Sequence, residues 1–205
     1  CLLKTLEEPP PQVALVLLTV DAGRLLPTTL SRCQRIDLSP LPRAAVQEAL
    51  ETRWSASPEQ ARLLAGLSQG RLGWAVGALG NSQLLRDYQG ERDRMASLVW
   101  AGLAQRLEAA DDLSRRAREG LLAGLRNWLG WWRDLLLAKG GAFSSLVNLD
   151  AEQEVKRQAK LLTLGQVAGF LRALVQAQDE IGLNVNSQLC LEGLMLRLPR
   201  LEGQT

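Results

Sequence analysis

Side chains that commonly do chemistry are scarce in this chain of 205 residues, which has no histidine and has cysteines only at positions 1, 33 and 190. Without histidine, a Ser-His-Asp or Cys-His nucleophilic site, an imidazole base and a histidine-bound metal are excluded. Three cysteines without a CxxC spacing form neither a four-cysteine zinc site nor a disulfide framework. We therefore expect no metal, reduced structural thiols and a cytoplasmic protein.

Phosphate chemistry by the chain alone is also disfavoured, because the sequence has no GxxxxGK[ST] loop and no strand ending in Asp-Glu to hold Mg²⁺. We expect no enzyme activity of its own. The residue best suited to phosphate is Arg32 of Ser31-Arg32-Cys33, since a guanidinium is always charged and offers a rigid fork of donors. Two other readings remain open for Arg32: bonding to the last carbonyls of a helix, or pairing with a carboxylate.

Two short apolar segments would have to position this arginine. Residues 13–18 (VALVLL) form a continuous apolar run typical of a strand buried in a parallel sheet, and residues 33–38 (CQRIDL) alternate like a second strand. Residues 2–8 read as the end of a helix that the following prolines stop, and residues 24–32 as a short helix. We expect one or two strands here, with apolar edges exposed around residues 13–18.

Beyond Ser39-Pro40-Leu41-Pro42 the sequence predicts only helices. Ser57 before Pro58 is an expected helix start, as is Asp150 with Gln153 at the capping-box position, and Gly140-Gly141 should end the helix before Asp150. The predicted helices are 42–54, 58–68, 72–79, 82–109, 112–139, 151–162, 164–182 and 187–198. The chain should therefore be mainly α-helical.

A family resemblance appears at residues 2–35 (LLKTLEEPPPQVALVLLTVDAGRLLPTTLSRCQR). This stretch resembles the end of the nucleotide-binding domain of bacterial DNA polymerase III clamp-loader subunits, the delta-prime and gamma/tau proteins of the AAA+ class. The resemblance implies that Arg32 acts in trans as an arginine finger on the γ-phosphate of ATP held by a neighbouring subunit. Thr19 stands where the family has a phosphate-sensing residue, although an ordinary strand-end threonine is an equal alternative. Cys33 would be a small core residue.

Residues 68–75 (SQGRLGWA) separate two members of this family. They resemble the start of the third lid helix, where ATP-hydrolysing gamma/tau subunits carry a second sensing arginine. Gly73 occupies that position here, which favours the non-hydrolysing delta-prime type. The alternative reading of Gly73 is a close contact between packed helices.

The C-terminal half resembles the helical collar of delta-prime, in residues 131–137 (WWRDLLL), 184–189 (NVNSQL) and 194–199 (LMLRLP). The implied domains are the end of a AAA+ core (1–38), a three-helix lid (39–80) and a helical-bundle collar (81–205). We expect most of the six tryptophans to be buried and one or two to lie at an interface. Asn186 should cap a helix and Asn184 lie in a turn, while Arg115, Arg116 and Arg118 should form a solvated face.

The resemblance implies a non-catalytic clamp-loader subunit of the DNA polymerase III holoenzyme. It would complete a neighbour's ATP site, carry no cofactor in this part of the chain, and bind gamma/tau and delta subunits through the collar and AAA+ faces. It would meet the sliding clamp and primed DNA only indirectly. Alternatives are an ATP-hydrolysing gamma/tau-type subunit, or a helical adaptor unrelated to nucleotides.

Three general properties complete these expectations. The net charge of +2 argues against a basic nucleic-acid-binding tail. The sequence has no apolar run long enough to span a membrane. Since the chain begins at Cys1 without methionine, we expect it to be a piece of a longer protein.

Overall fold

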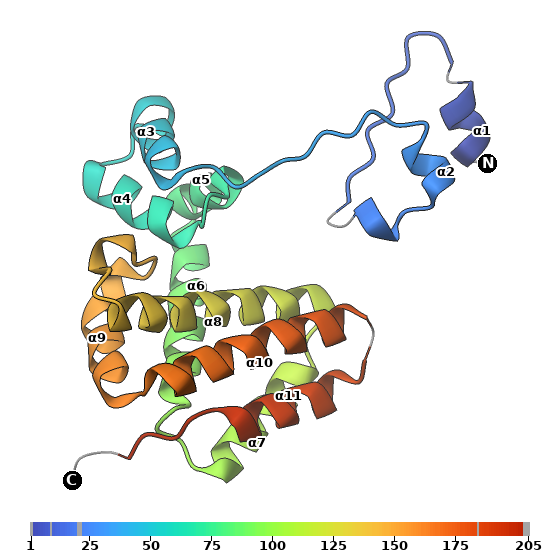
Figure 1. Ribbon diagram of the computed structural model, residues 1–205. Helices are drawn as coiled ribbons and strands as arrows, with labels where there is room; N and C mark the ends of the chain where they lie inside the picture. The colour runs from blue at the N-terminus through green and yellow to red at the C-terminus, as the bar shows by residue number, and fades with distance from the viewer. Residues whose placement is uncertain (1, 9, 20–21, 184, 203–205) are drawn as a thin grey trace. The chain divides into compact units, whose positions relative to one another are not determined.

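The computed structural model describes residues 2–8, 10–19, 22–183 and 185–202, and these form α-helices and short 3₁₀ turns with no strand (Figure 1). The expected mainly α-helical class is therefore confirmed. The chain divides into two compact units, Cys1–Ser39 (unit 1) and Pro40–Thr205 (unit 2). None of the helices that the structure describes has the length and hydrophobicity that crossing a bilayer would require.

Unit 1 contains α1 (Leu2–Glu7), the 3₁₀ turn η1 (Ala22–Arg24) and α2 (Pro27–Leu30). The two expected strands differ from the structure, in which the described residues of 13–18 and 33–38 are not assigned to any sheet. A strand exists only when its backbone pairs with a neighbour, so apolar alternation alone does not produce one. The expected exposure around residues 13–18 is confirmed, because Val16 is 79% and Leu18 88% exposed.

Unit 2 begins with three short helices close to their expected bounds: α3 (Arg43–Trp54), α4 (Pro58–Leu67) and α5 (Leu72–Gly80). The expected cap of α4 is confirmed, because Ser57 Oγ accepts a hydrogen bond from Gln60 N and Pro58 opens the helix. The helices share an apolar core whose buried members include Val46, Leu50, Ala61, Leu64, Ala65 and Ala75.

The remaining helices of unit 2 are α6 (Ser82–Ser97), α7 (Leu103–Ser114), α8 (Arg118–Lys139), α9 (Glu152–Leu161), α10 (Leu164–Gly182) and α11 (Ser187–Arg197). α8 packs against α10, α9 and α6, while α11 packs against α7 and α10 (Figure 1). Gly140 ends α8 as expected, and the Asn186 side chain caps α11 by accepting from Gln188 N and Leu189 N. Asn184 lies outside the described residues.

The predicted bounds of two helices, 82–109 and 112–139, were wrong, because α7 crosses the break expected between them and α8 begins only at Arg118. The single helix expected over 82–109 is broken between α6 and α7, where Leu98 and Val99 turn into the core and are 6% and 1% exposed. Gly102 then opens α7, and its N–H donates to Gln105 Oε1. Because the residues of this turn are apolar and buried, the apolar pattern of the sequence continues across it as it would in a helix. The sequence pattern therefore does not reveal the break.

The expected cap at Asp150 was also wrong. Asp150 lies in the 3₁₀ turn η3 (Leu149–Ala151), and Ala151 takes the position before α9 without a side-chain cap. The Asp150 carboxylate instead accepts two hydrogen bonds from Arg92 Nη1, at 2.7 and 2.8 Å. Arg92 is itself buried, so the ion pair neutralises a charge that would otherwise be costly to bury.

Burial was expected for most of the six tryptophans, and the structure fully buries three of them, all on α8. Trp128, Trp131 and Trp132 are each at most 1% exposed. Phe170 of α10 packs edge-on to Trp128 and tilted against Trp132, with ring centroids 5.0 and 4.4 Å apart. Trp131 Nε1 donates to Gln158 Oε1 at 3.1 Å. Trp54, in contrast, is 40% exposed.

Candidate functional site

Arg32 is the second residue after α2, a helix only four residues long that ends at Leu30. Pro27 at the first position and extended Leu26 before it fix where this helix starts. At its end, Ser31 N donates to Pro27 O at 2.9 Å, and Ser31 Oγ donates to Thr28 O at 3.2 Å. The turn that carries the arginine is therefore held by local hydrogen bonds.

The Arg32 side chain makes both contacts that the sequence left open as alternatives to phosphate binding. Its Nη1 donates to Thr28 O at 2.8 Å, and its Nη2 lies 2.5 Å from Glu7 Oε1. The two charged side chains are 34% and 48% exposed. An ion pair this exposed contributes about 0–1 kcal/mol, so a phosphate with more negative charge competes with Glu7 at little cost.

Thr19 and Arg32 do not line the same pocket of unit 1. Thr19 is exposed and borders a pocket of about 420 Å³ with Thr29 and Asp37. Arg32 borders a second pocket of about 560 Å³, lined mostly by apolar side chains. Cys33 is half-buried and lines both pockets. The phosphate-sensing role of Thr19 remains a prediction.

Gly73 is the second residue of α5 and lies at the surface. A Cβ built on Gly73 would meet nothing within 4 Å, so the alternative reading as a close helix contact was wrong. Glycine is required instead at Gly70, whose φ is +82° and whose Cβ would lie 2.5 Å from Leu41 O. A side chain at position 73 would point into open space.

The arginines near the start of α8 all have partners within the chain. Arg115 pairs with Asp111 at 2.5 Å, Arg116 pairs with Glu91, and Arg118 donates to Gly182 O. Arg115 is 72% exposed, as expected for a solvated face, whereas Arg116 is only 34% exposed. These contacts connect residues 115–118 to other helices of unit 2 or to the preceding turn of α7.

The sequence pattern did not separate a second apolar face of α10 from the buried one. The buried face carries Val167, Phe170, Leu174, Ala177 and Ile181, whereas Leu164, Leu171 and Val175 lie on a neighbouring stripe with spacings of seven and four residues. Val175 is 46% and Leu164 58% exposed. Both stripes show helical periodicity, and only packing distinguishes which one is covered.

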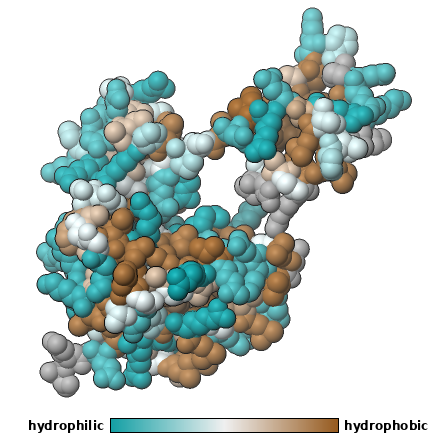
Figure 2. Space-filling view, viewed as in Figure 1, coloured by the Kyte–Doolittle hydropathy of each residue, from teal (hydrophilic) through white to brown (hydrophobic). Residues whose placement is uncertain are grey.

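The exposed stripe continues into a wider apolar surface on unit 2. Leu171, Val175 and Leu183 line a shallow groove of about 450 Å³, bordered by charged Arg172 and Asp179. Apolar side chains gather in the region of α8 and α10 in Figure 2. On α11, Leu189 and Leu196 add side chains that are 66% and 65% exposed. We call Leu164, Leu171, Val175, Leu183, Leu189 and Leu196 the apolar face of unit 2.

Comparison with known proteins agrees with the resemblance seen at residues 2–35. The family described as "DNA polymerase III, delta subunit" matches residues 1–42. The DNA polymerase III subunit delta' of Bacillus subtilis (strain 168) is 29% identical over 204 residues. This alignment covers 96% of the chain but 60% of the Bacillus protein, so the chain spans about three fifths of that relative's length. The predicted resemblance is therefore confirmed: over nearly its whole length, the chain is similar to the delta-prime subunit of bacterial DNA polymerase III.

Proposed function

We propose that this chain is the larger part of a non-catalytic clamp-loader subunit of the delta-prime type, which acts in DNA replication in the cytoplasm. The observation that carries the proposal is the similarity to delta-prime across 96% of the chain. The similarity extends over unit 2, beyond the matched residues 1–42, so it favours the delta-prime type over an unrelated protein that shares only a nucleotide-binding segment.

Arg32 is the proposed point of action. In this role its guanidinium leaves Glu7 and Thr28 O and reaches the γ-phosphate of ATP bound by a neighbouring gamma/tau subunit. The positive charge of Arg32 stabilises the negative charge on the transferring phosphoryl group. The neighbouring subunit then does not need to supply this positive charge itself. The exposed and weakly held side chain supports this role, because little interaction energy is lost on departure.

The apolar face of unit 2 is the proposed collar contact with the other loader subunits, including gamma/tau and delta. Exposed leucines and valine on α10 and α11 would be covered by neighbouring collars, which removes apolar area from water. Trp128, Trp131 and Trp132 do not contribute to such a contact, since they are buried within unit 2. The sliding clamp and primed DNA are indirect partners of this assembly.

A gamma/tau-type subunit that hydrolyses ATP is the alternative within the same family. Gly73 speaks against it, because the position is open and would accommodate the second sensing arginine that such subunits carry. The sequence of the complete gene product separates the two, since the delta-prime type should have a degenerate or absent GxxxxGK[ST] loop.

Replacement of Arg32 tests the proposed role. In the full-length protein, Arg32→Ala should leave its circular dichroism unchanged but lower the ATPase and clamp-loading rates of the reconstituted loader. The site completed by Arg32 should lose on the order of 10³-fold in hydrolysis rate, whereas the other sites keep theirs. Arg35→Ala is the matched control, because Arg35 is also exposed and paired with a nearby carboxylate, Asp37.

The outcomes distinguish the remaining hypotheses. Equal ATPase rates for Arg32→Ala and Arg35→Ala would refute the finger role. A chain that does not assemble with gamma/tau and delta at all would support the unrelated helical adaptor instead.

A further inference from the structure

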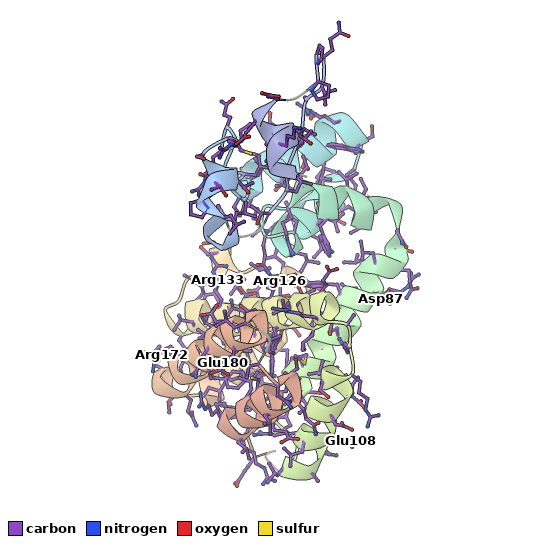
Figure 3. The ribbon with its side chains drawn as sticks, turned by 90° about the vertical axis from the view of Figure 1, so that its right-hand side faces the viewer. Asp87, Glu108, Arg126, Arg133, Arg172 and Glu180 are labelled. Carbon is purple, nitrogen blue, oxygen red and sulfur yellow. The ribbon has the colours of Figure 1, made fainter. Side chains whose placement is uncertain are left out.

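Five arginines from distant parts of the sequence come close together in unit 2: Arg43 and Arg133 line one pocket, the charge of Arg62 acts on Arg43, and the charge of Arg126 acts on Arg71. They are Arg43 of α3, Arg62 of α4, Arg71 before α5, and Arg126 and Arg133 of α8. Figure 3 shows Arg126 and Arg133 projecting from the same side of α8. We call the surface formed by these five residues the arginine groove.

Arg43 and Arg133 define one end of the arginine groove. Both line a pocket of about 310 Å³, together with Gln69 and Gly70. Arg43 Nη1 donates to Leu146 O at 3.1 Å, and its guanidinium carbon lies 3.6 Å from the place of a Cβ on Gly66. The absence of a side chain at position 66 thus leaves room for the guanidinium.

Arg71 and Arg126 define the other end. Positions 126, 130 and 133 share one face of α8, and Arg126 and Arg133 stand about 10 Å apart along the helix axis. Gln69 Nε2 lies 2.8 Å from the place of a Cβ on Gly130, so the amide sits between Arg126 and Arg133. Gln69 adopts an unusual left-handed backbone, with φ of 50°. Burial lowers the pKa of Arg71, and the charge of nearby Arg126 lowers it further.

The positive charges of the arginine groove have little compensation. Within the described part of the chain, none of its five arginines forms an ion pair with a carboxylate, although several other arginines do. The carboxylate that acts on Arg43 is Asp134. Asp134 is fully buried and accepts hydrogen bonds from Val147 N and Asn148 N at 2.8 to 3.1 Å. The groove therefore presents a locally positive surface on a chain of nearly neutral net charge.

We propose that the arginine groove binds the phosphodiester backbone of a nucleic-acid strand. Arginine forks match phosphate oxygens, and such binding needs charge without apolar anchors. A protein partner usually relies on apolar or aromatic anchors. The pocket offers only Leu41, at 43% exposure, as an exposed large apolar side chain, because Leu146 and Val147 are buried. The choice of nucleic acid over other polyanions also rests on the proposed role in DNA replication. It goes beyond the sequence-based expectation, in which this chain meets DNA only indirectly.

The test measures fluorescence anisotropy of a labelled 20-nucleotide oligothymidine with the 205-residue chain between 50 and 200 mM salt. Arg126→Gln with Arg133→Gln removes two groove charges. Arg53→Gln with Arg86→Gln removes two exposed charges that lie outside the groove. Both pairs of positions are exposed on helices, so both variants should keep the wild-type circular dichroism.

Counterion release sets the expected result. Five phosphate contacts on a single strand give a slope of log K against log salt of about −3.5, and three contacts give about −2.1. The association constant should fall about 100-fold across this salt range for the wild type and the control, but about 20-fold for the groove variant. At 50 mM salt the groove variant should bind about 60-fold more weakly than the wild type.

Three results would overturn the proposal: no binding of the wild type at 50 mM salt, equal binding by the groove and control variants, or displacement of the DNA by polyglutamate of equal charge concentration. The last result would assign the groove to an acidic protein segment. Because the assay needs no other subunit, its failure is distinct from failure of the Arg32 experiment.

Discussion

Arg106 of α7 should hold residues 198–199 against residues 98–99. Its side chain is 5% exposed and donates to four backbone carbonyls: Leu98 O at 3.0 Å, Val99 O at 3.1 Å, Leu198 O at 2.5 Å and Pro199 O at 3.0 Å. Burial lowers the pKa of Arg106, and nearby Arg200 lowers it further. The guanidinium nevertheless remains charged at neutral pH.

The magnitude of the effect follows from what each carbonyl retains in Arg106→Met. Leu98 O still accepts a hydrogen bond from Ala101 N, and Val99 O still accepts one from Leu201 N. Leu198 O and Pro199 O, in contrast, lose the hydrogen bonds that Arg106 donates to them. Leaving a buried acceptor unsatisfied costs about 1–3 kcal/mol. Since Pro199 is only partly buried and can reach water, we expect a net loss of about 2–4 kcal/mol.

Urea unfolding followed by tryptophan fluorescence provides the assay, because Trp128, Trp131 and Trp132 report on the same core. Arg106→Lys should be intermediate, since an ammonium keeps the charge but cannot reproduce the planar fork. Arg53→Met, at an exposed position of α3, should change the unfolding free energy by no more than about 0.5 kcal/mol. The reasoning is refuted if Arg106→Met unfolds within that same range.

Two further predictions concern Tyr88 and two glycines. Burial raises the pKa of Tyr88, the sole tyrosine, to about 12. In the chain unfolded by guanidinium chloride, Tyr88 should ionise at about pH 10. Its absorbance near 295 nm should therefore change about two pH units higher in the folded chain than in the unfolded chain. Because the unfolded state ionises first, Tyr88 should reduce stability as pH rises from about 10 to about 12; titration of the folded chain near 10 would contradict this. Gly66→Ala places a Cβ 2.9 Å from Val147 O and should lower stability by about 1–3 kcal/mol, whereas Gly169→Ala meets nothing within 4 Å inside α10 and should raise it by about 0.5–1 kcal/mol. Equal thermal midpoints for the two glycine variants would contradict the packing argument.

Local signals predicted most of the helices of unit 2. Ser57 followed by Pro58, the glycine at 140 and the cap at Asn186 each act within one helical turn, so their effect is visible in a few residues of sequence. The turn at 98–102 and the placement of Asp150 were missed. Each depends on a contact with a distant partner: the core for Leu98 and Val99, and Arg92 for the carboxylate.

The candidate site shows the same division. The triplet Ser31-Arg32-Cys33 marked Arg32 as a candidate for phosphate binding, and local hydrogen bonds within α2 explain its position. The sequence predicted that Arg32 could pair with a carboxylate but not that the carboxylate is Glu7, because 25 positions separate the two residues. Thr19 shows the limit of this reasoning, since adjacency to the same apolar segment did not place it in the pocket of Arg32.

The sequence by itself determined the helical class, most helix ends, the absence of histidine chemistry and the resemblance carried by residues 2–35. These depend on residue type and on spacings of three or four positions, which are written directly in the chain. Only the tertiary structure decided which apolar stripe of α10 stays exposed, and that arginines from positions 43 to 133 face one groove. Charge in a sequence is a sum, whereas the electrostatic potential at a surface depends on distance, so a chain of net charge +2 can still present a concentrated positive site.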